Sequence, residues 1–242
     1  SGYIHKAVDV EGVGERAGKH DSPKGLGLGT AETEINTKTD DEVAQLAAAI
    51  KSALVQLEGK LHIESLLFDI FGFSRGAAAA RHFANRVQAE DQSIISAISA
   101  GMGKITYRGT PTGKTRFLGI MDTVAAVGTL ANGLNPHSAD TGNVDIRLRP
   151  GVAEKVFHIT AQHECRYNFA LNSIAPAWPE LILPGAHSDI GGGYRPQLRE
   201  DLFLTRPLVE TLPHNQPDTQ SRVYRQTMAQ LRVLEHSPAI MP

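Results

Sequence analysis

The chain has 242 residues, a length that suits one large α/β domain and is too short for two of comfortable size. Its 24 Lys and Arg residues nearly balance its 26 Asp and Glu residues, which removes the electrostatic case for a nucleic-acid binder. The single cysteine, Cys165, can form no intrachain disulfide and no cysteine-rich zinc site. The composition is that of an ordinary globular domain. Gln162-His163-Glu164 has no second histidine at helical distance, so we expect no metal site, and we expect no cofactor.

The first half of the chain predicts alternating strands and helices. Residues 3–10 form a short strand-like run, and residues 14–39 read as a long loop rich in glycine. A helix is predicted from Thr39 to Gly59, because its apolar residues recur at spacings of three and four. The dense apolar run 63–71 predicts a strand covered on both faces, as in a parallel sheet. Further on we expect a helix at 77–87, a weaker helix at 88–100 and a strand at 116–121.

The second half continues the alternation less regularly. Residues 128–151 read as a loop, residues 156–161 and 180–183 as strands, and residues 164–171 as a helix. An amphipathic helix is predicted at about 220–236. That helix could lie on a membrane surface, but covering the core of the same domain is the favoured interpretation.

This order of elements predicts a doubly wound, α/β-hydrolase-like fold. We expect a mostly parallel sheet with helices on both faces and long loops over its C-terminal edge. A complete hydrolase sheet usually has more than the five predicted strands, so we expect this sheet to lack its first strands. Residues 1–200 are interpreted as the catalytic domain, and residues 201–242 as a partly helical extension that packs on it.

The segment Gly72-Phe73-Ser74-Arg75-Gly76 fits the Gly-x-Ser-x-Gly pattern of a nucleophile elbow. Such a turn joins a strand to a helix so tightly that side chains at the flanking positions would collide, and it presents the serine Oγ above the sheet edge. The bare pattern is weak, but an apolar strand precedes it and an alanine-rich helix follows. Ser74 is therefore the candidate nucleophile, with a tight turn of no chemical consequence as the alternative.

A nucleophilic serine needs a base, and the base needs an orienting carboxylate. In hydrolases of this fold the partners follow in the order serine, acid, histidine, each after a strand. Asp122 and His187 occupy such positions. Asp122 could instead cap a following helix, and His187 could be structural. Asp189 is a rival carboxylate, although we expect it to bond local backbone.

The oxyanion of an acyl-transfer intermediate needs backbone donors. We expect one donor at the amide of Arg75, where the helix begins, and a second in the glycine-rich loop at Gly12 and Val13. A glycine-rich turn without that role explains the loop equally well.

Four blocks of sequence carry a family resemblance. They are GFSRGAAAAR at 72–81, LGIMDTVAAVG at 118–128, ITAQHECRYNF at 159–169 and LPGAHSDIGGGY at 183–194. In this order they resemble the blocks of the bacterial type VI secretion phospholipase effectors, over about residues 3–195. The resemblance implies a serine phospholipase acting on acyl esters, with Ser74, Asp122 and His187 as its triad.

The resemblance also implies partners and a location. Members of this family are delivered into rival bacteria by a spike protein and are neutralised by a cognate immunity protein. A protein made in the cytoplasm without a Sec signal and released into the target-cell periplasm would fit that route, and residues 1–20 lack an apolar signal core. The Asp-Gly-Thr block with which family members usually begin does not occur here, so we expect a chain that lacks segments.

Three functions remain open from the sequence. The first is a phospholipase A that acts at a membrane surface. The second is an esterase or thioesterase of small soluble esters. The third is a binding module that kept the hydrolase fold without turnover.

Overall fold

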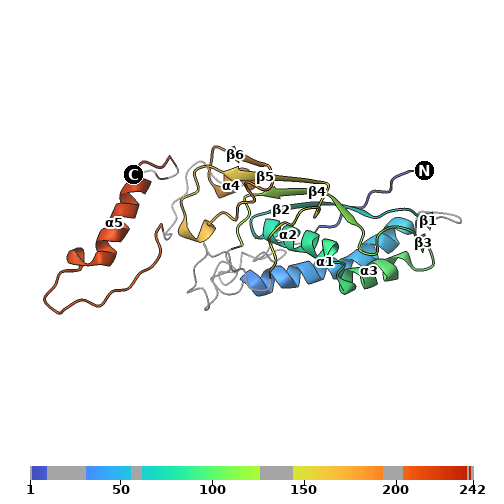
Figure 1. Cartoon of the computed structure of the whole chain (residues 1–242), viewed down its shortest axis with the longest axis horizontal. Helices are drawn as coiled ribbons and strands as arrows, with labels where there is room; N and C mark the ends of the chain where they lie inside the picture. Colours follow the sequence, from blue (N-terminus) through green and yellow to red (C-terminus); the bar gives the residue numbers. More distant parts are fainter. Residues whose placement is uncertain are drawn as a thin grey trace.

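The computed structural model describes residues 2–9, 31–55, 62–125, 144–192, 204–238 and 240. A four-stranded sheet forms one layer, and a layer of helices lies along one of its sides (Figure 1). The helices are α1 (Ala31–Leu54), α2 (Arg75–Gln88), α3 (Gln92–Met102), α4 (His187–Gly191) and α5 (Arg222–Leu234), with 3-10 turns at Tyr167–Phe169 and Asp218–Gln220. The strands are β1 (His62–Ile63), β2 (Leu67–Phe73), β3 (Thr106–Tyr107), β4 (Lys114–Met121), β5 (Lys155–Ala161) and β6 (Glu180–Leu183).

The main sheet has the strand order β2-β4-β5-β6, and all of its pairings are parallel. The register runs across the strands from Gly72 to Ile120, His158 and Glu180. β1 and β3 form a separate parallel pair. The predicted α/β class with a mostly parallel sheet is therefore confirmed, and the C-terminal ends of four strands meet at one edge. Helices were expected on both faces, but among the described residues α1, α2 and α3 lie on one side of the sheet (Figure 1).

Small side chains bring α2 onto the sheet. Ala77, Ala80 and Ala84 are buried against Leu118 and Ile120. A run of alanines favours the helix and leaves no bulk between its backbone and the strands. This close approach fixes the start of α2 directly above the end of β2.

A second apolar cluster joins α1 to α3 and to the far side of α2. Its buried members are Val43, Leu46, Ile50, Leu54, Phe83, Val87, Ile94, Ile98 and Met102. The predicted spacing of three and four along α1 is what places Leu46, Ile50 and Leu54 on this face. A Cβ added at Gly101 would lie 2.8 Å from Ile50 Cβ, so α1 and α3 pack closely at that point.

The helix α1 begins earlier than predicted. Thr39 and the acidic residues after it resemble a helix start, but α1 begins at Ala31 and Thr39 lies inside it. Thr39 is buried and its Oγ1 donates to the carbonyl of Ile35, one turn back. A residue that could cap a helix can also make this bond within one, so the sequence signal was ambiguous.

Two predicted strands differ from the structure. Residues 3–9 of the first predicted strand form no strand, and Tyr3 is 77% exposed. The predicted strand 63–71 divides into β1 and β2, which pair with different partners. Phe71 on β2 is 66% exposed, so the expectation of burial on both faces was wrong for this strand.

The predicted helix at 164–171 does not form. Only Tyr167–Phe169 make a 3-10 turn, and Arg166 before it has extended backbone angles. The Glu164 carboxylate accepts hydrogen bonds from the backbone and side chain of Arg166, and this local bonding competes with a helix.

The remaining helical predictions are confirmed, with shifted ends. The weak helix predicted at 88–100 is α3, whose start is capped by the Asp91 side chain, and Glu90 separates it from α2 with φ 55°. The amphipathic helix predicted at 220–236 is α5, which is drawn at the opposite end of the molecule from α3 (Figure 1). It buries none of its residues, so the described part of the chain does not support the interpretation that this helix covers the core. The division at residue 200 stays a prediction.

We predict that Asn85→Ala lowers the free energy of unfolding by about 1–3 kcal/mol. The buried Asn85 amide donates to the carbonyls of Asp145 and Arg147 and so fastens that segment to α2. Gln88→Ala is the control, because Gln88 bonds the carbonyl of Pro150 from an exposed position. Urea unfolding of both variants measures the difference, and equal losses would contradict the prediction.

We predict a pH-dependent effect of Glu42→Gln. Burial raises the pKa of Glu42 from 4.5 to about 7, although Arg86 opposes the shift. The folded chain therefore holds this proton to a higher pH than the unfolded chain does, so its stability falls as the pH rises from 4.5 to about 7 and the loss is complete above that. The variant should be more stable than the parent by about 1–3 kcal/mol at pH 8 and equal to it below pH 4.5. Asp41→Asn, at an exposed position beside it, is the control, and urea unfolding at the two pH values compares both variants with the parent. An equal gain in stability at both pH values for Glu42→Gln would contradict the prediction.

Candidate active site

Ser74 stands in a strained turn between β2 and α2. Its φ of 57° and ψ of −124° are rare for a residue with a side chain. Its amide donates to the carbonyl of Met121, and its own carbonyl accepts from the amides of Ala77, Ala78 and Val124. These bonds hold the turn against the end of β4, which is the geometry expected of a nucleophile elbow.

The two glycines of the elbow differ in what they allow. A Cβ at Gly72 would lie 2.6 Å from the carbonyl carbon of Gly76 and 2.8 Å from Ala77 Cα, so a side chain has no room there. No described atom lies within 4 Å of a Cβ built at Gly76. The prediction that collisions require glycine on both sides is therefore supported at Gly72 only.

Asp122 follows β4 in a second strained turn, with φ 40°. Its amide donates to the carbonyl of Ile159, and its carboxylate oxygen Oδ1 accepts from the amide of Ala161. The side chain is almost fully buried. Both bonds come from β5, so the pairing of β4 with β5 sets the direction of the carboxylate.

His187 joins these two residues. Its Nδ1 lies 2.6 Å from Asp122 Oδ2, and its Nε2 lies 2.8 Å from Ser74 Oγ. A carboxylate can only accept, so Nδ1–H donates to Asp122, which leaves Nε2 to accept from the Ser74 hydroxyl. The structure thus brings together all three residues that the sequence placed after successive strands.

Aromatic rings enclose the imidazole of His187. The Phe73 ring lies 4.5 Å from it, centroid to centroid, and the Phe169 ring meets it at 68° with centroids 5.0 Å apart. Gly191 supports this packing, since a Cβ there would lie 2.6 Å from Phe73 Cδ1. The rings keep the imidazole in the plane that contains both of its hydrogen bonds.

An ion pair lies directly behind His187. The Glu164 carboxylate accepts the amide of His187 at 3.1 Å and three N–H groups of Arg166 at 2.7–2.8 Å. The Arg166 guanidinium in turn stacks 3.7 Å from the centre of the Phe169 ring. Burial alone would raise the pKa of Glu164, but the bonds from Arg166 lower it below its ordinary value.

A second buried histidine, His158, bonds the residue that follows Asp122. His158 Nε2 accepts from the amide of Thr123 at 3.1 Å, so its Nδ1–H donates to Glu180 at 2.8 Å. Burial lowers the pKa of His158, although Glu180 opposes the shift. His158 is therefore a neutral donor and acceptor that connects β4 to β6.

The other predicted site residues have different outcomes. Arg75 begins α2, so its amide lies in the first turn of a helix beside Ser74. Gly12 and Val13 lie outside the described residues. Asp189 accepts the amide of Ala186 with its Oδ2, as expected of a local backbone partner.

Glu164, Arg166 and His158 contribute to the site although no sequence pattern predicts it. Each is at least half buried and has several polar partners, but none belongs to a short catalytic motif. For Glu164 and Arg166 the available signal was the block ITAQHECRYNF at 159–169, which carried the family resemblance without a role, whereas His158 lies just before that block. A charged pair two residues apart in a polar segment is also what a solvated turn would show.

Three further observations concern the described part of the chain. No group of three or more metal-ligating side chains that could hold an ion is found in it. None of its helices has the length and apolar character to cross a membrane. Burial, followed by the charge of Glu164, raises the pKa of the Cys165 thiol, which disfavours its thiolate form.

A parallel α/β sheet with serine, acid and histidine at its C-terminal edge defines a protein of the α/β-hydrolase type. The family described as "T6SS, Phospholipase effector Tle1-like, catalytic domain" matches residues 88–212. The chain belongs to this family of type VI secretion phospholipase effectors.

A solved structure of a type VI effector agrees with this assignment. The chain is 44% identical to the protein in "Structure of the Tle1 effector bound to the VgrG spike from the Type 6 secretion system", with a TM-score of 0.64. That similarity covers 88% of this chain and 44% of the effector, so the chain spans less than half of that relative's length. An uncharacterized protein from Pseudomonas aeruginosa is 29% identical over 67% of this chain and 23% of its own, with a TM-score of 0.40. No curated protein matches the chain.

We predict that the two elbow glycines respond oppositely to alanine. Gly72→Ala should lower the free energy of unfolding by about 1–3 kcal/mol or more, because its Cβ meets backbone that cannot move independently. Gly76→Ala should be neutral or stabilising by up to about 1 kcal/mol, since it lies within α2. Thermal and urea unfolding compare the two, and similar losses at both positions would contradict the steric reading.

Proposed function

We propose that this chain is a serine-dependent phospholipase A and that Ser74, His187 and Asp122 are its catalytic triad. The single observation that carries the proposal is the continuous path of hydrogen bonds from Ser74 Oγ through His187 to Asp122. Membership of the phospholipase effector family supports a lipid ester as the substrate.

The first half of the reaction forms an acyl-enzyme. As Ser74 Oγ attacks the carbonyl carbon of the ester, its proton passes to His187 Nε2. Asp122 holds the imidazole by Nδ1–H and stabilises the positive charge that develops on it. The imidazolium then protonates the leaving alcohol oxygen, and the acyl C–O bond breaks.

The second half returns the free enzyme. A water molecule gives its proton to His187 Nε2 and attacks the acyl carbon, and the fatty acid leaves as Ser74 Oγ regains the proton. Because the bond cleaved lies between acyl carbon and alcohol oxygen, a phospholipid yields a fatty acid and a lysophospholipid. This product pair is what distinguishes type A activity from cleavage at the phosphate.

The tetrahedral intermediates place negative charge on the former carbonyl oxygen. The Arg75 amide, in the first turn of α2, is proposed as one donor to this oxyanion. The loop that contains Gly12 and Val13 is proposed to supply the second. The positive end of the α2 dipole adds to the stabilisation, since the helix points its N-terminus at Ser74.

The biological setting proposed is antibacterial. The neighbouring effector is bound to a VgrG spike in its structure, which supports a spike protein as the carrier of this chain. We further propose that it is secreted by the type VI system into the periplasm of a target cell, where phospholipid is the substrate and an immunity protein protects the producer. Residues 1–200 are proposed as the catalytic domain and residues 201–242 as its extension.

We predict that a fluorophosphonate probe adds once to the parent chain and not to Ser74→Ala. The hydrolysis of phosphatidylethanolamine vesicles should fall by at least about 10³-fold in that variant, because no other group takes the acyl chain. Ser65→Ala, at an exposed position before β2, is the control and should keep full labelling and activity. Intact mass measures the adduct, and chromatography of the lipid products identifies the lysophospholipid.

The same experiment separates the alternatives. Rapid turnover of short-chain monomeric esters with no lysophospholipid would favour a soluble esterase or thioesterase. A folded chain that binds a spike or immunity protein but takes no probe would favour a binding module. Unchanged lipid hydrolysis by Ser74→Ala would overturn the proposal.

A further inference from the structure

His187 has to reach across the sheet. It follows β6, at one edge, whereas Ser74 follows β2, at the other edge of the order β2-β4-β5-β6. Three strand spacings separate those edges, roughly 14 Å. The chain after β6 must therefore turn back over the end of β5 before the imidazole can meet its partners.

The segment between β6 and His187 is hydrogen-bonded to the chain that follows β5. The amide of Gln162 donates to the carbonyl of Leu183, and the amide of His163 donates to the carbonyl of Gly185. Gly185 has a φ of 123°, a value that a residue with a side chain rarely adopts. The last attachment before the imidazole is the bond from the His187 amide to Glu164.

The Glu164–Arg166 pair is costly to bury. Its side chains are 9% and 8% exposed, and removing two charges from water commonly costs as much as their attraction returns. The pair is thus a poor device for stability alone. Arg166 bonds both carboxylate oxygens of Glu164 through Nε and Nη2 and so holds the carboxylate in one orientation. The carboxylate is therefore a rigid acceptor for the amide of His187.

Arg166 also contacts the imidazole ring of His187 indirectly, through Phe169. The Arg166 guanidinium stacks on Phe169, and Phe169 contacts the imidazole of His187. Arg166 therefore fixes the position of the His187 main chain through Glu164 and the orientation of the His187 ring through Phe169.

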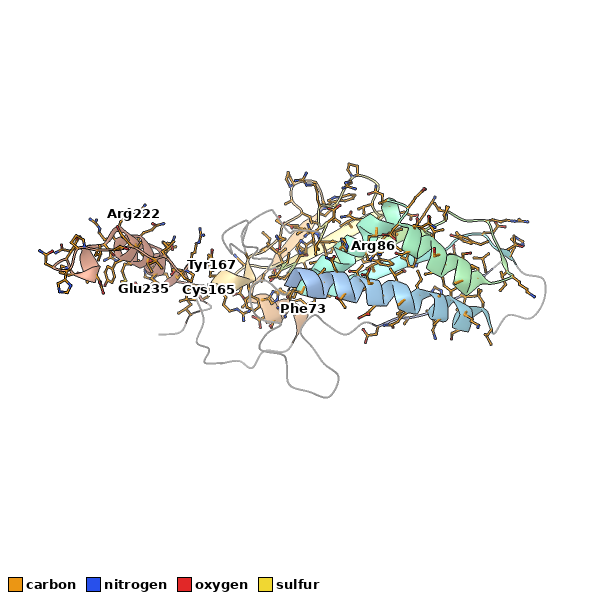
Figure 2. The ribbon with its side chains drawn as sticks, turned by 90° about the horizontal axis from the view of Figure 1, so that it is seen from below. Phe73, Arg86, Cys165, Tyr167, Arg222 and Glu235 are labelled. Carbon is orange, nitrogen blue, oxygen red and sulfur yellow. The ribbon has the colours of Figure 1, made fainter. Side chains whose placement is uncertain are left out.

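Figure 2 shows where this segment lies. Cys165 and Tyr167, which flank Arg166, lie at the end of the body toward α5, and Arg86 lies farther along the helices.

We propose that Glu164, Arg166 and Phe169 form a positioning clamp for His187. The proposal rests on the triad proposed above: the clamp touches no reacting atom and acts by holding Nε2 within bonding distance of Ser74 Oγ. A displacement of about 1 Å at a catalytic group can reduce the rate about 100-fold, so loss of the clamp should be visible in catalysis.

The test compares Glu164→Ala, Glu164→Gln and Arg166→Lys with the parent chain. In Glu164→Ala, kcat on phospholipid vesicles should fall by about 10–100-fold while KM changes by less than about twofold, because the acyl site is untouched. Glu164→Gln retains one acceptor and should lie between that variant and the parent. Arg166→Lys should resemble Glu164→Ala, since an ammonium group cannot hold both oxygens or stack on Phe169 in the same way.

A second readout does not depend on turnover. The Nδ1–H of His187, bonded to Asp122, should give a far-downfield proton resonance, assigned by its absence in Asp122→Asn. We expect this resonance to broaden or disappear in Glu164→Ala in a chain that remains folded by circular dichroism. Because this measurement is made without substrate, it tests whether Glu164 positions His187 even if the parent chain hydrolyses no phospholipid.

Asp91→Asn is the matched control. Asp91 is also an acid paired with an arginine, Arg86, at 2.9 Å, and burial opposes bonds from Ser93 and Arg86 that lower its pKa to about 2. It lies beyond the far end of α2, about 20 Å or more from Ser74 along that helix. The control should lose stability and keep both kcat and the resonance. A folded Glu164→Ala that keeps kcat and the resonance, or a control that loses them equally, would overturn the clamp.

Discussion

The contact between Gly72 and the first turn of α2 is the constraint on which the rest of the site depends. Because a Cβ at Gly72 would meet the backbone of Gly76 and Ala77, α2 can start only where the side chain is missing. That close start forces Ser74 into a positive φ and holds its carbonyl over three amides. The strain is local, and the hydrogen bonds that offset it come from α2 and from the end of β4.

Three acid–base pairs surround this turn in a low-dielectric environment. His187 bonds Asp122, His158 bonds Glu180, and Arg166 bonds Glu164. Removing one partner of any pair would leave the other buried without its hydrogen bond and would lower the free energy of unfolding. Each pair therefore holds its two side chains in a fixed geometry. Their arrangement follows the strand order, since Ser74, Asp122, Glu164 and His187 come from the ends of β2, β4, β5 and β6 in turn.

The sequence predicts the parts of this arrangement that depend on chain order alone. Ser74, Asp122 and His187 were found because each follows an apolar strand, and parallel strands end at one edge. Glu164 was missed because its role depends on where the chain from β6 crosses, which no local pattern encodes. For the same reason the periodicity of α1 was read correctly while its start was not: Thr39 offers a cap or an internal bond, and only the folded chain selects one.

His187 also shows why the site forms as a unit. Its backbone is held from β5, its Nδ1 from β4 and its Nε2 from β2, although the residue itself belongs to the end of β6. No two neighbouring strands are sufficient to place it, because the contacts span the whole sheet. The hydrogen bond between His187 and Ser74 therefore depends on contacts from the ends of all four strands.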